Sequence, residues 1–259
     1  MNFARKAMLT VLGLLTTVAF GCAQPTKIRI ATDAGFPPFH MIDANGRATG
    51  YDVELAAAVV TQAGLEPEIV VVDSFSDLFT GLTAGDHDLV AATTGITADR
   101  QERFLFTEPY FSTCQAVLVR IGQQEPESIA ELAGCWVGAS QGTTSVAAAR
   151  RTQASEVFEV RSASDGVSAL LTRNIDAYIA DEFEAVARAK ANRGLRVLRQ
   201  PAALERYGFV LARNRPDLKR RLDRALREIE ASGFARKLRV RYGLERPADW
   251  PVDLSLAIE

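Results

Sequence analysis

Short segments of alternating and helically spaced apolar residues follow one another along the chain. Residues 27–32 (KIRIAT) alternate polar and apolar side chains, which is typical of a strand. Residues 51–63 place apolar side chains at helical spacing, with Asp52 as the predicted N-cap and Gly64 as the stop. The pattern then predicts a strand at 68–72, a helix at 77–84 and a strand at 88–93. Strands and helices that alternate in this way predict an α/β fold with largely parallel sheets.

A second series of the same kind begins after Phe111. It predicts a helix at 144–151 and strands at 116–120, 136–140, 156–160 and 177–180. In both series a helix ends at a residue suited to the left-handed conformation, Gly85 or Asn174, and an Asp and a strand follow. Two α/β units of this kind predict two lobes, and the carboxyl ends of their strands would face one cleft. Two charged helices are expected beyond them, at 217–232 and 234–242.

The N-terminal residues follow the layout of a secretory signal. Two cations, Arg5 and Lys6, precede an apolar run at 7–20 that is too short to span a membrane. Cleavage after Ala23 would release a soluble protein, and residues 1–23 would be the signal peptide. Acylation of Cys22 in a lipobox-like stretch is the alternative, and the sequence leaves both open. Export to the periplasm is expected in either case.

Composition and charge narrow the range of functions. A hydrophobic content of 47% and a charged content of 24% are typical of a globular protein. The net charge of -2, with both signs interspersed, leaves no basic face, so nucleic acid is not an expected partner. His40 and His87 lie far apart, and Cys114 and Cys135 lack the spacing of metal ligands. We therefore expect neither a metal nor a cofactor, and a disulfide is permitted but not required.

Five segments carry the candidate chemistry. They are residues 31–39 (ATDAGFPPF), 50–55 (GYDVEL), 95–110 (GITADRQE at 95–102 and FTEPY at 106–110), 141–144 (QGTT) and 180–182 (ADE). Together they resemble the polar amino acid-binding proteins of bacterial uptake transporters, solute-binding protein family 3, over residues 27–243. The resemblance implies a two-lobed type II periplasmic binding fold, with two mixed sheets flanked by helices.

The same resemblance implies a division of the chain into discontinuous lobes. Residues 24–110 and 208–259 would form lobe 1, and residues 111–207 would form lobe 2. Two hinge crossings are expected, near 110–114 and 204–207. A ligand would bind where the two lobes close on each other.

An amino acid zwitterion buried in such a cleft needs a partner for each of its charges. The guanidinium of Arg100 suits the carboxylate, and backbone N–H groups at Gly95 and Thr144 would complete its shell. Asp181, at the end of an apolar strand, is the matching anion for the ammonium. Its alternative role is to cap the helix that follows.

The remaining site residues come from the resemblance. Phe36 and Phe75 match an aromatic pair that holds the ligand's side-chain stem, although each could be an ordinary core residue. Asp33 matches the position that touches the end of a glutamine or basic side chain, or it caps a turn. Thr93 and Gly95 nearly exchange the usual small and hydroxyl residues, so the hydroxyl common in the family is missing at Gly95.

One alternative function is an enzyme on the same fold. Glu184 matches the catalytic residue of cyclohexadienyl dehydratases, whose substrates are prephenate and arogenate. However, Gln115 and Thr144 stand where those enzymes carry a helper Lys and Asn. We therefore expect a binding protein, not an enzyme. The expected partners are a free amino acid, glutamine or basic, and the membrane permease of an ABC transporter. We expect a monomer that meets the membrane itself only if Cys22 is lipidated.

Overall fold

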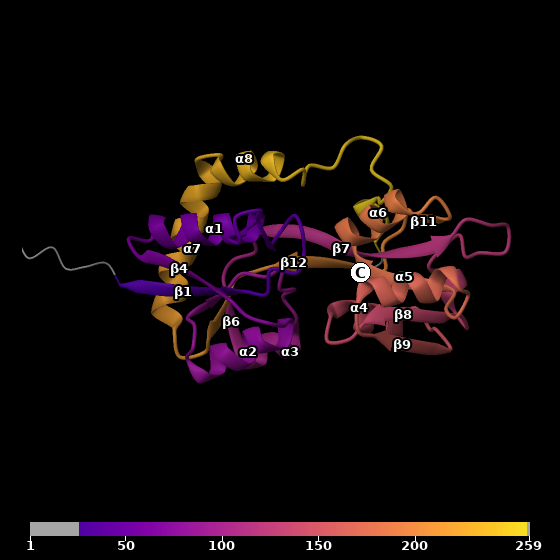
Figure 1. Cartoon of the computed structure of the whole chain (residues 1–259), viewed down its shortest axis with the longest axis horizontal. Coiled ribbons are helices and arrows are strands. Elements are labelled where there is room, and N and C mark those ends of the chain that lie inside the picture. The colour runs from indigo at the N-terminus through magenta and orange to yellow at the C-terminus, as the bar shows by residue number, and fades with distance from the viewer. Residues whose placement is uncertain (1–25, 258–259) are drawn as a thin grey trace, which may run out of the picture.

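The computed structural model describes residues 26–257, and they form two α/β lobes joined by a hinge (Figure 1). One sheet has the strand order β4-β1-β5-β13-β6, and the other has the order β11-β7-β10-β8-β9 with β12 paired to β7. Each sheet combines parallel and antiparallel neighbours. The two-lobed fold with mixed sheets that the resemblance implied is therefore confirmed.

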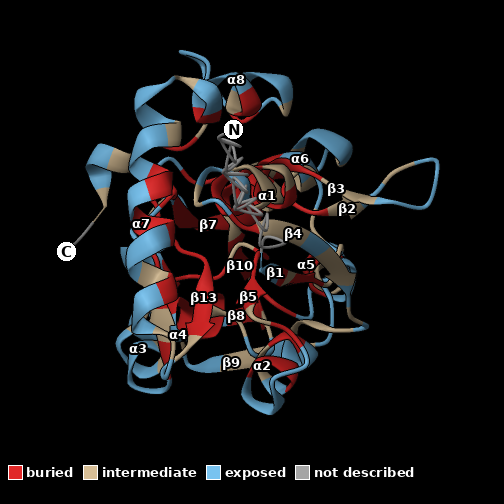
Figure 2. Ribbon diagram, turned by 90° about the vertical axis from the view of Figure 1, so that its left-hand side faces the viewer, coloured by how far each residue is buried: buried red, intermediate tan, exposed pale blue. Residues whose placement is uncertain are grey.

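Lobe 1 is built around β1 (Lys27–Thr32), which pairs in parallel with two strands. The other strands are β2 (Met41–Ile42), β3 (Ala48–Thr49), β4 (Glu66–Val71), β5 (Leu89–Val90), β6 (Phe104–Phe106) and β13 (Val210–Ala212). The helices are α1 (Tyr51–Gln62), α2 (Phe75–Ala84), α3 (Ala98–Arg103), α7 (Pro216–Ala231) and α8 (Phe234–Arg241). Leu218, Leu222 and Leu226 recur every fourth residue on α7 and are buried, while its outer face is exposed (Figure 2).

Lobe 2 is built around β7 (Phe111–Arg120), whose residues are almost all buried. The other strands are β8 (Trp136–Ser140), β9 (Glu156–Val160), β10 (Ala177–Asp181), β11 (Leu195–Val197) and β12 (Ala203–Tyr207). The helices are α4 (Thr144–Arg151), α5 (Ala163–Leu171) and α6 (Glu182–Ala191), with single 3-10 turns at Ala130–Leu132 and Leu254–Leu256. The bounds of β8, α4 and β9 coincide with the ranges predicted from the sequence.

Two local predictions were wrong. Gly50, not Asp52, is the N-cap of α1, because the chain enters the helix with a φ of 122°. A Cβ atom at this position would lie 2.3 Å from the carbonyl oxygen of Phe39, so only glycine fits. In the second series Arg173, with a φ of 63°, takes the left-handed position in place of Asn174. Gly85 adopts that conformation as predicted, with a φ of 81°.

The hinge consists of two antiparallel strands and an aromatic cluster. Residues of β7 and β12 pair from Phe111↔Tyr207 onward, and the chain crosses between the lobes next to these two residues. Phe39 of lobe 1 packs edge-on against Phe111, Tyr207 and Phe183, the last at a centroid distance of 5.5 Å. Rings from both lobes thus meet and pack beside the predicted crossings.

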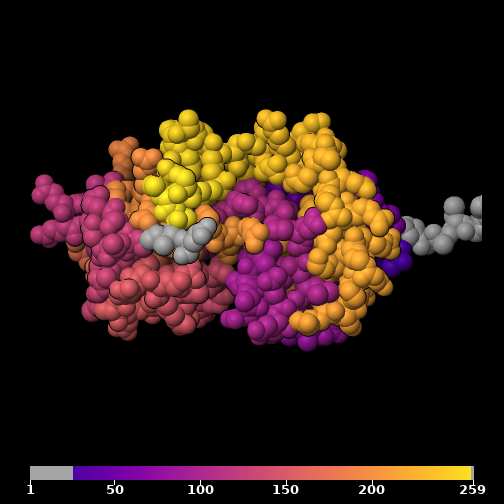
Figure 3. Space-filling model, turned by 180° about the vertical axis from the view of Figure 1, so that it is seen from behind, coloured from indigo at the N-terminus to yellow at the C-terminus, as the bar shows by residue number. Residues whose placement is uncertain are grey.

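A third connection runs through the C-terminal tail, defined here as residues 242–257. After α8 the chain leaves lobe 1 and returns across the hinge to lobe 2, and the yellow segment spans both lobes in Figures 1 and 3. Val252 is buried in the core of lobe 2, and the Asp253 N–H donates to the carbonyl oxygen of Arg199 at 2.8 Å. The division predicted from the sequence counted this whole segment with lobe 1. Leu244 is buried in the core of lobe 1, whereas Val252 is buried in that of lobe 2.

Residues 1–25, which include the predicted signal peptide and Cys22, lie outside the described residues. Within 26–257, every helix is too short or too polar to cross a bilayer. Cys114 and Cys135 are both free thiols, so the permitted disulfide is not formed.

Candidate functional site

Arg100 lies where the lobes meet. It belongs to α3, whose N-cap Thr97 accepts a hydrogen bond from the Arg100 N–H at 3.2 Å. Its guanidinium donates to the carbonyl oxygen of Gly95 at 3.0 Å and, across the cleft, to that of Gly142 at 3.4 Å. It also lies over the ring of Phe75, 5.5 Å from the centroid. Burial lowers the pKa of Arg100, although the nearby Glu205 acts in the opposite direction.

Glu205 is a functional-site residue that the sequence analysis missed. It projects from β12, and its carboxylate accepts hydrogen bonds from the Thr144 hydroxyl at 2.6 Å and from the Gln115 side-chain amide. The other end of that amide accepts a hydrogen bond from Ser145 at 2.5 Å. Burial raises the pKa of Glu205 despite these donors. The only signal in the sequence was its position inside the predicted crossing at 204–207.

Asp181 lies at the carboxyl end of β10, as predicted. Its Oδ1 accepts a hydrogen bond from the Phe183 N–H at 2.9 Å, so the alternative role as N-cap of α6 is observed. Its Oδ2 accepts hydrogen bonds from the Thr113 hydroxyl at 3.1 Å and from the Tyr207 hydroxyl. Among residues 26–257, Asp181 forms no ion pair within 4.0 Å. Burial raises its pKa to about 7.

Asp33 and Thr93 meet on the two sides of His40. Nδ1 of His40 lies 3.0 Å from Oδ1 of Asp33, outside hydrogen-bond geometry, and its Nε2 lies 3.2 Å from the Thr93 hydroxyl. Burial acts to raise the pKa of Asp33, but the His40 contact and backbone N–H groups bring it below the usual value. Thr93 itself has a left-handed backbone, with a φ of 39°.

Asp52 holds the strained backbone of Thr93 in place. Its fully buried carboxylate accepts a hydrogen bond from the Thr93 N–H at 2.5 Å. Burial raises the pKa of Asp52 to about 6. The residue predicted to cap α1 therefore supports the loop that carries two predicted site residues, Thr93 and Gly95.

The two predicted aromatic residues lie on separate segments of lobe 1, and both are partly buried. Phe36 stacks on Phe39 at a centroid distance of 5.5 Å and an interplanar angle of 7°. Phe75 packs edge-on against Phe79 at 5.2 Å and lies beneath Arg100. Each ring is thus partly a core residue, in keeping with the alternative left open by the sequence.

The fold brings the predicted residues into two groups. Gly95, Arg100 and Thr144 gather around Glu205, whereas Asp33 and Thr93 gather around His40. Tyr207 links the first of these groups to Asp181, because its backbone pairs with Gly95 while its hydroxyl donates to the aspartate. A groove at the cleft runs between α3 and α4, and Figure 3 shows the two lobes meeting there.

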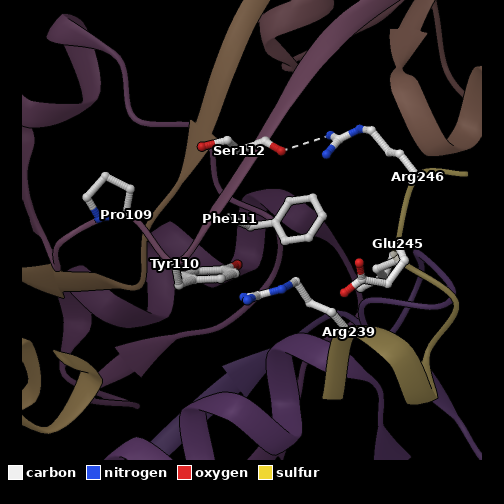
Figure 4. A pocket seen from close by; sticks show the side chains of 8 residues that line it. Pro109, Tyr110, Phe111, Ser112, Arg239, Glu245 and Arg246 are labelled. Atoms are coloured by element: carbon white, nitrogen blue, oxygen red, sulfur yellow. Dashed lines mark hydrogen bonds between the residues drawn. The ribbon is translucent and has the colours of Figure 1, made fainter. Parts of the chain in front are cut away.

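A second cavity lies on the other side of the hinge, next to the tail (Figure 4). Tyr110, Phe111, Arg239 and Arg246 contribute to its lining. Arg246 donates to the Ser112 carbonyl oxygen at 2.9 Å and forms an ion pair with the buried Glu182. Arg239 forms an ion pair with Glu230 at 3.2 Å. Both of these cations already have anionic partners.

Comparisons with known proteins identify the family of the chain. Residues 28–245 match the family model for bacterial extracellular solute-binding proteins, family 3. The chain is 27% identical to the histidine-binding periplasmic protein of Salmonella typhimurium, over 90% of this chain and 93% of that protein. It is 30% identical to arginine-binding protein 1 of Escherichia coli, where the match covers 52% of this chain and 55% of the relative. That match spans about half the length of the relative.

Solved structures share the fold. The arginine-, lysine-, histidine-binding protein ArtJ of Geobacillus stearothermophilus superposes with a TM-score of 0.74 at 28% identity, covering 86% of this chain and 97% of that one. An ancestral amino acid-binding protein, a precursor of cyclohexadienyl dehydratase, superposes with a TM-score of 0.72 at 26% identity, covering 83% and 94%. The chain belongs to the bacterial extracellular solute-binding proteins of family 3.

Proposed function

We propose that the protein is the solute-binding component of an ABC uptake system and that its lobes close around a free amino acid. The observation that carries this proposal is the placement of opposite charges on opposite lobes. Arg100 of lobe 1 reaches the cleft, and Asp181 of lobe 2 ends a buried strand without an ion-pair partner among residues 26–257. An α-amino acid carries the two complementary charges on one carbon atom, which suits such a pair.

A basic side chain is the favoured ligand type, with glutamine as the other candidate. Asp33 adds a second carboxylate from lobe 1, and its low pKa keeps it ionised at neutral pH. The named relatives support this choice, since they bind arginine and histidine. Replacement of Asp33 by Ala should weaken the binding of arginine or glutamine more than that of alanine. Equal losses across these ligands would make Asp33 a structural residue.

We place the mature protein in the periplasm, where it would act as a monomer and deliver its ligand to a membrane permease. The family description and the periplasmic relatives support this location. Whether the mature protein starts after Ala23 or carries a lipid on Cys22 is tested by fatty-acid labelling of wild type and Cys22→Ala.

Isothermal calorimetry against the common amino acids tests the proposed function. Arg100→Ala or Asp181→Ala should each weaken binding by roughly two to four powers of ten, because an unpaired buried charge costs about 3–5 kcal/mol. Arg103→Ala is the matched control, since it removes a cation from the same helix that lies over Phe104. A loss below about fivefold for both site variants, equivalent to about 1 kcal/mol, would contradict the proposed site.

We further propose that the protein does not dehydrate prephenate or arogenate. Glu184 is partly buried, and burial raises its pKa, but its carboxylate pairs with Arg188 at 3.4 Å. Gln115 and Thr144 both donate to Glu205, so neither is free to stabilise a departing group. Incubation with prephenate should yield no phenylpyruvate above the spontaneous rate. Product formation that is lost in Glu184→Gln would establish the enzyme instead.

A further inference from the structure

The carboxylate of Glu205 lies in the place expected for the carboxylate of the ligand. That place was predicted to lie between Gly95, Arg100 and Thr144. Oε1 of Glu205 is so close to Gly95 that a Cβ atom on this glycine would be 1.8 Å from it. The same oxygen accepts the Thr144 hydrogen bond at 2.6 Å. Arg100 donates to the carbonyl oxygen of the adjacent Gly95, and no nitrogen of Arg100 lies within 4.0 Å of the Glu205 carboxylate.

The donors around Glu205 form a complete carboxylate site. Thr144 donates to one oxygen, and Gln115 donates to the other. Ser145 fixes the orientation of the Gln115 amide by donating to its oxygen at 2.5 Å. These donors belong to lobe 2, Arg100 and Gly95 belong to lobe 1, and Glu205 itself stands on the hinge strand β12. A carboxylate bound here therefore touches both lobes, as a bound ligand would.

Gly95 is the residue that makes room for this arrangement. The hydroxyl side chain common at this position in the family would collide with the Glu205 carboxylate, because even a Cβ atom does not fit. The glycine at position 95 and the Glu205 carboxylate therefore depend on each other. The sequence alone showed that the hydroxyl is missing at Gly95 but did not explain why.

We propose, on the basis of the proposed function, that Glu205 is a self-ligand whose carboxylate fills the ligand's carboxylate pocket in the free protein and leaves it when an amino acid binds. The apparent affinity for an amino acid is then reduced by the fraction of molecules in which the pocket is free. A decarboxylated amine does not need this pocket, so it escapes the competition. Glu205 therefore lowers the affinity for amino acids but not that for the corresponding amines, and the ratio of the two affinities becomes smaller.

Calorimetry with arginine and with its decarboxylated form, agmatine, tests the proposal. Glu205→Ala should bind arginine about tenfold or more tightly than wild type, since the competitor is gone, and the affinity for agmatine should not rise. Glu205→Gln should also tighten arginine binding, because it keeps the length of the side chain but removes the charge that Arg100 attracts. Glu156→Ala, on the exposed end of β9, is the control and should leave both affinities unchanged.

Several outcomes would overturn the self-ligand. If wild type binds arginine and Glu205→Ala binds it no more tightly, Glu205 does not compete with the ligand for the carboxylate pocket. Equal losses of arginine and agmatine in Glu205→Ala would mean that Glu205 holds a cation of the ligand. If Glu205→Ala fails to fold, Glu205→Gln alone decides, and an unchanged arginine affinity rejects the proposal. Failure of wild type and all variants to bind any amino acid would instead reject the proposed function, and the self-ligand with it.

Discussion

Asp181 and Glu182 are adjacent in the sequence, but their carboxylates face opposite sides of the hinge. Glu182 has a cationic partner and Asp181 has none among residues 26–257. On the tail side, Glu182 is fully buried and receives hydrogen bonds from Arg246 at 2.7 Å and from the Trp250 indole at 2.5 Å. On the cleft side, Asp181 is held by two hydroxyls and one backbone N–H, with no ion pair among residues 26–257. The Thr113 hydroxyl lies between the two carboxylates, 3.1 Å from Oδ2 of Asp181 and 3.2 Å from Oε2 of Glu182, and its one hydrogen can be donated to either.

This difference separates a structural charge from a candidate binding charge. A buried carboxylate with a cation and a full set of donors is already neutralised, and it serves to tie the tail to the hinge. A buried carboxylate without a cation remains costly until a ligand brings one. The raised pKa of Asp181, about 7 because of burial, is the mark of that cost. Ligand binding should therefore depend on the cleft side and stability on the tail side.

The largest expected effect is the loss of Arg246. Arg246→Ala should lower the free energy of unfolding by about 3–5 kcal/mol, because it leaves Glu182 buried without its cation. Urea unfolding measures this loss. The control Arg241→Ala removes an exposed partner of Glu54, and it should cost no more than about 1 kcal/mol. Equal small losses in both variants would mean that the tail-side pair does not stabilise the protein.

Asp181→Asn should produce the reverse result. Asn remains a good N-cap, so stability should not fall, while the charge that would meet the ligand's ammonium is lost. We expect binding of the best amino acid ligand to weaken by about a hundredfold or more, measured by calorimetry. The exposed Asp165→Asn serves as control. A variant that loses stability but keeps its affinity would place Asp181 on the structural side of the comparison.

Trp250→Phe should have a smaller effect on stability than Arg246→Ala. It keeps the aromatic contact with Phe183 but removes the indole N–H that donates to Glu182. A hydrogen bond to a charged group contributes about 1.5–3 kcal/mol, which sets the expected loss in free energy of unfolding. Amino acid affinity should stay within about twofold of wild type, a difference below about 0.5 kcal/mol. A large loss of affinity would show that the tail also controls the cleft.

The last expected effect is a pH dependence of stability in the ligand-free protein. Asp181 and Asp52 have pKa values of about 7 and about 6, both raised by burial above the values of the unfolded chain. The folded state therefore binds more protons between pH 4 and pH 7, and stability falls as the pH rises through that range. Each group contributes at most about 1.4 kcal/mol per pH unit.

Unfolding at a series of pH values, for wild type and Asp181→Asn, isolates the share of Asp181. The variant should show a shallower fall between pH 4 and pH 7, and Asp165→Asn should match wild type. Identical profiles for wild type and Asp181→Asn would mean that Asp181 is not strained in the free protein.

The sequence by itself determined the local elements and most of the candidate site. Alternating and helical spacing located β1, β8, α4 and β9 correctly. The periodicity of apolar residues that marks each element lies within one short stretch of the sequence. The order of the motifs predicted the two lobes, and residue type alone marked Arg100 and Asp181 as candidates for binding a zwitterion. Each of these inferences needed only neighbouring residues and their chemistry.

Only the tertiary structure decided how charges far apart in the sequence are paired. Asp52 is adjacent to a helix start in sequence, yet it supports Thr93 from another segment. The tail joins lobe 2 because Val252 finds apolar surface there, although the chain has just left lobe 1. Glu205 fills the space above Gly95 across an interval of more than a hundred residues. Sequence spacing carries no record of such contacts, because they depend on which surfaces the folded chain brings together.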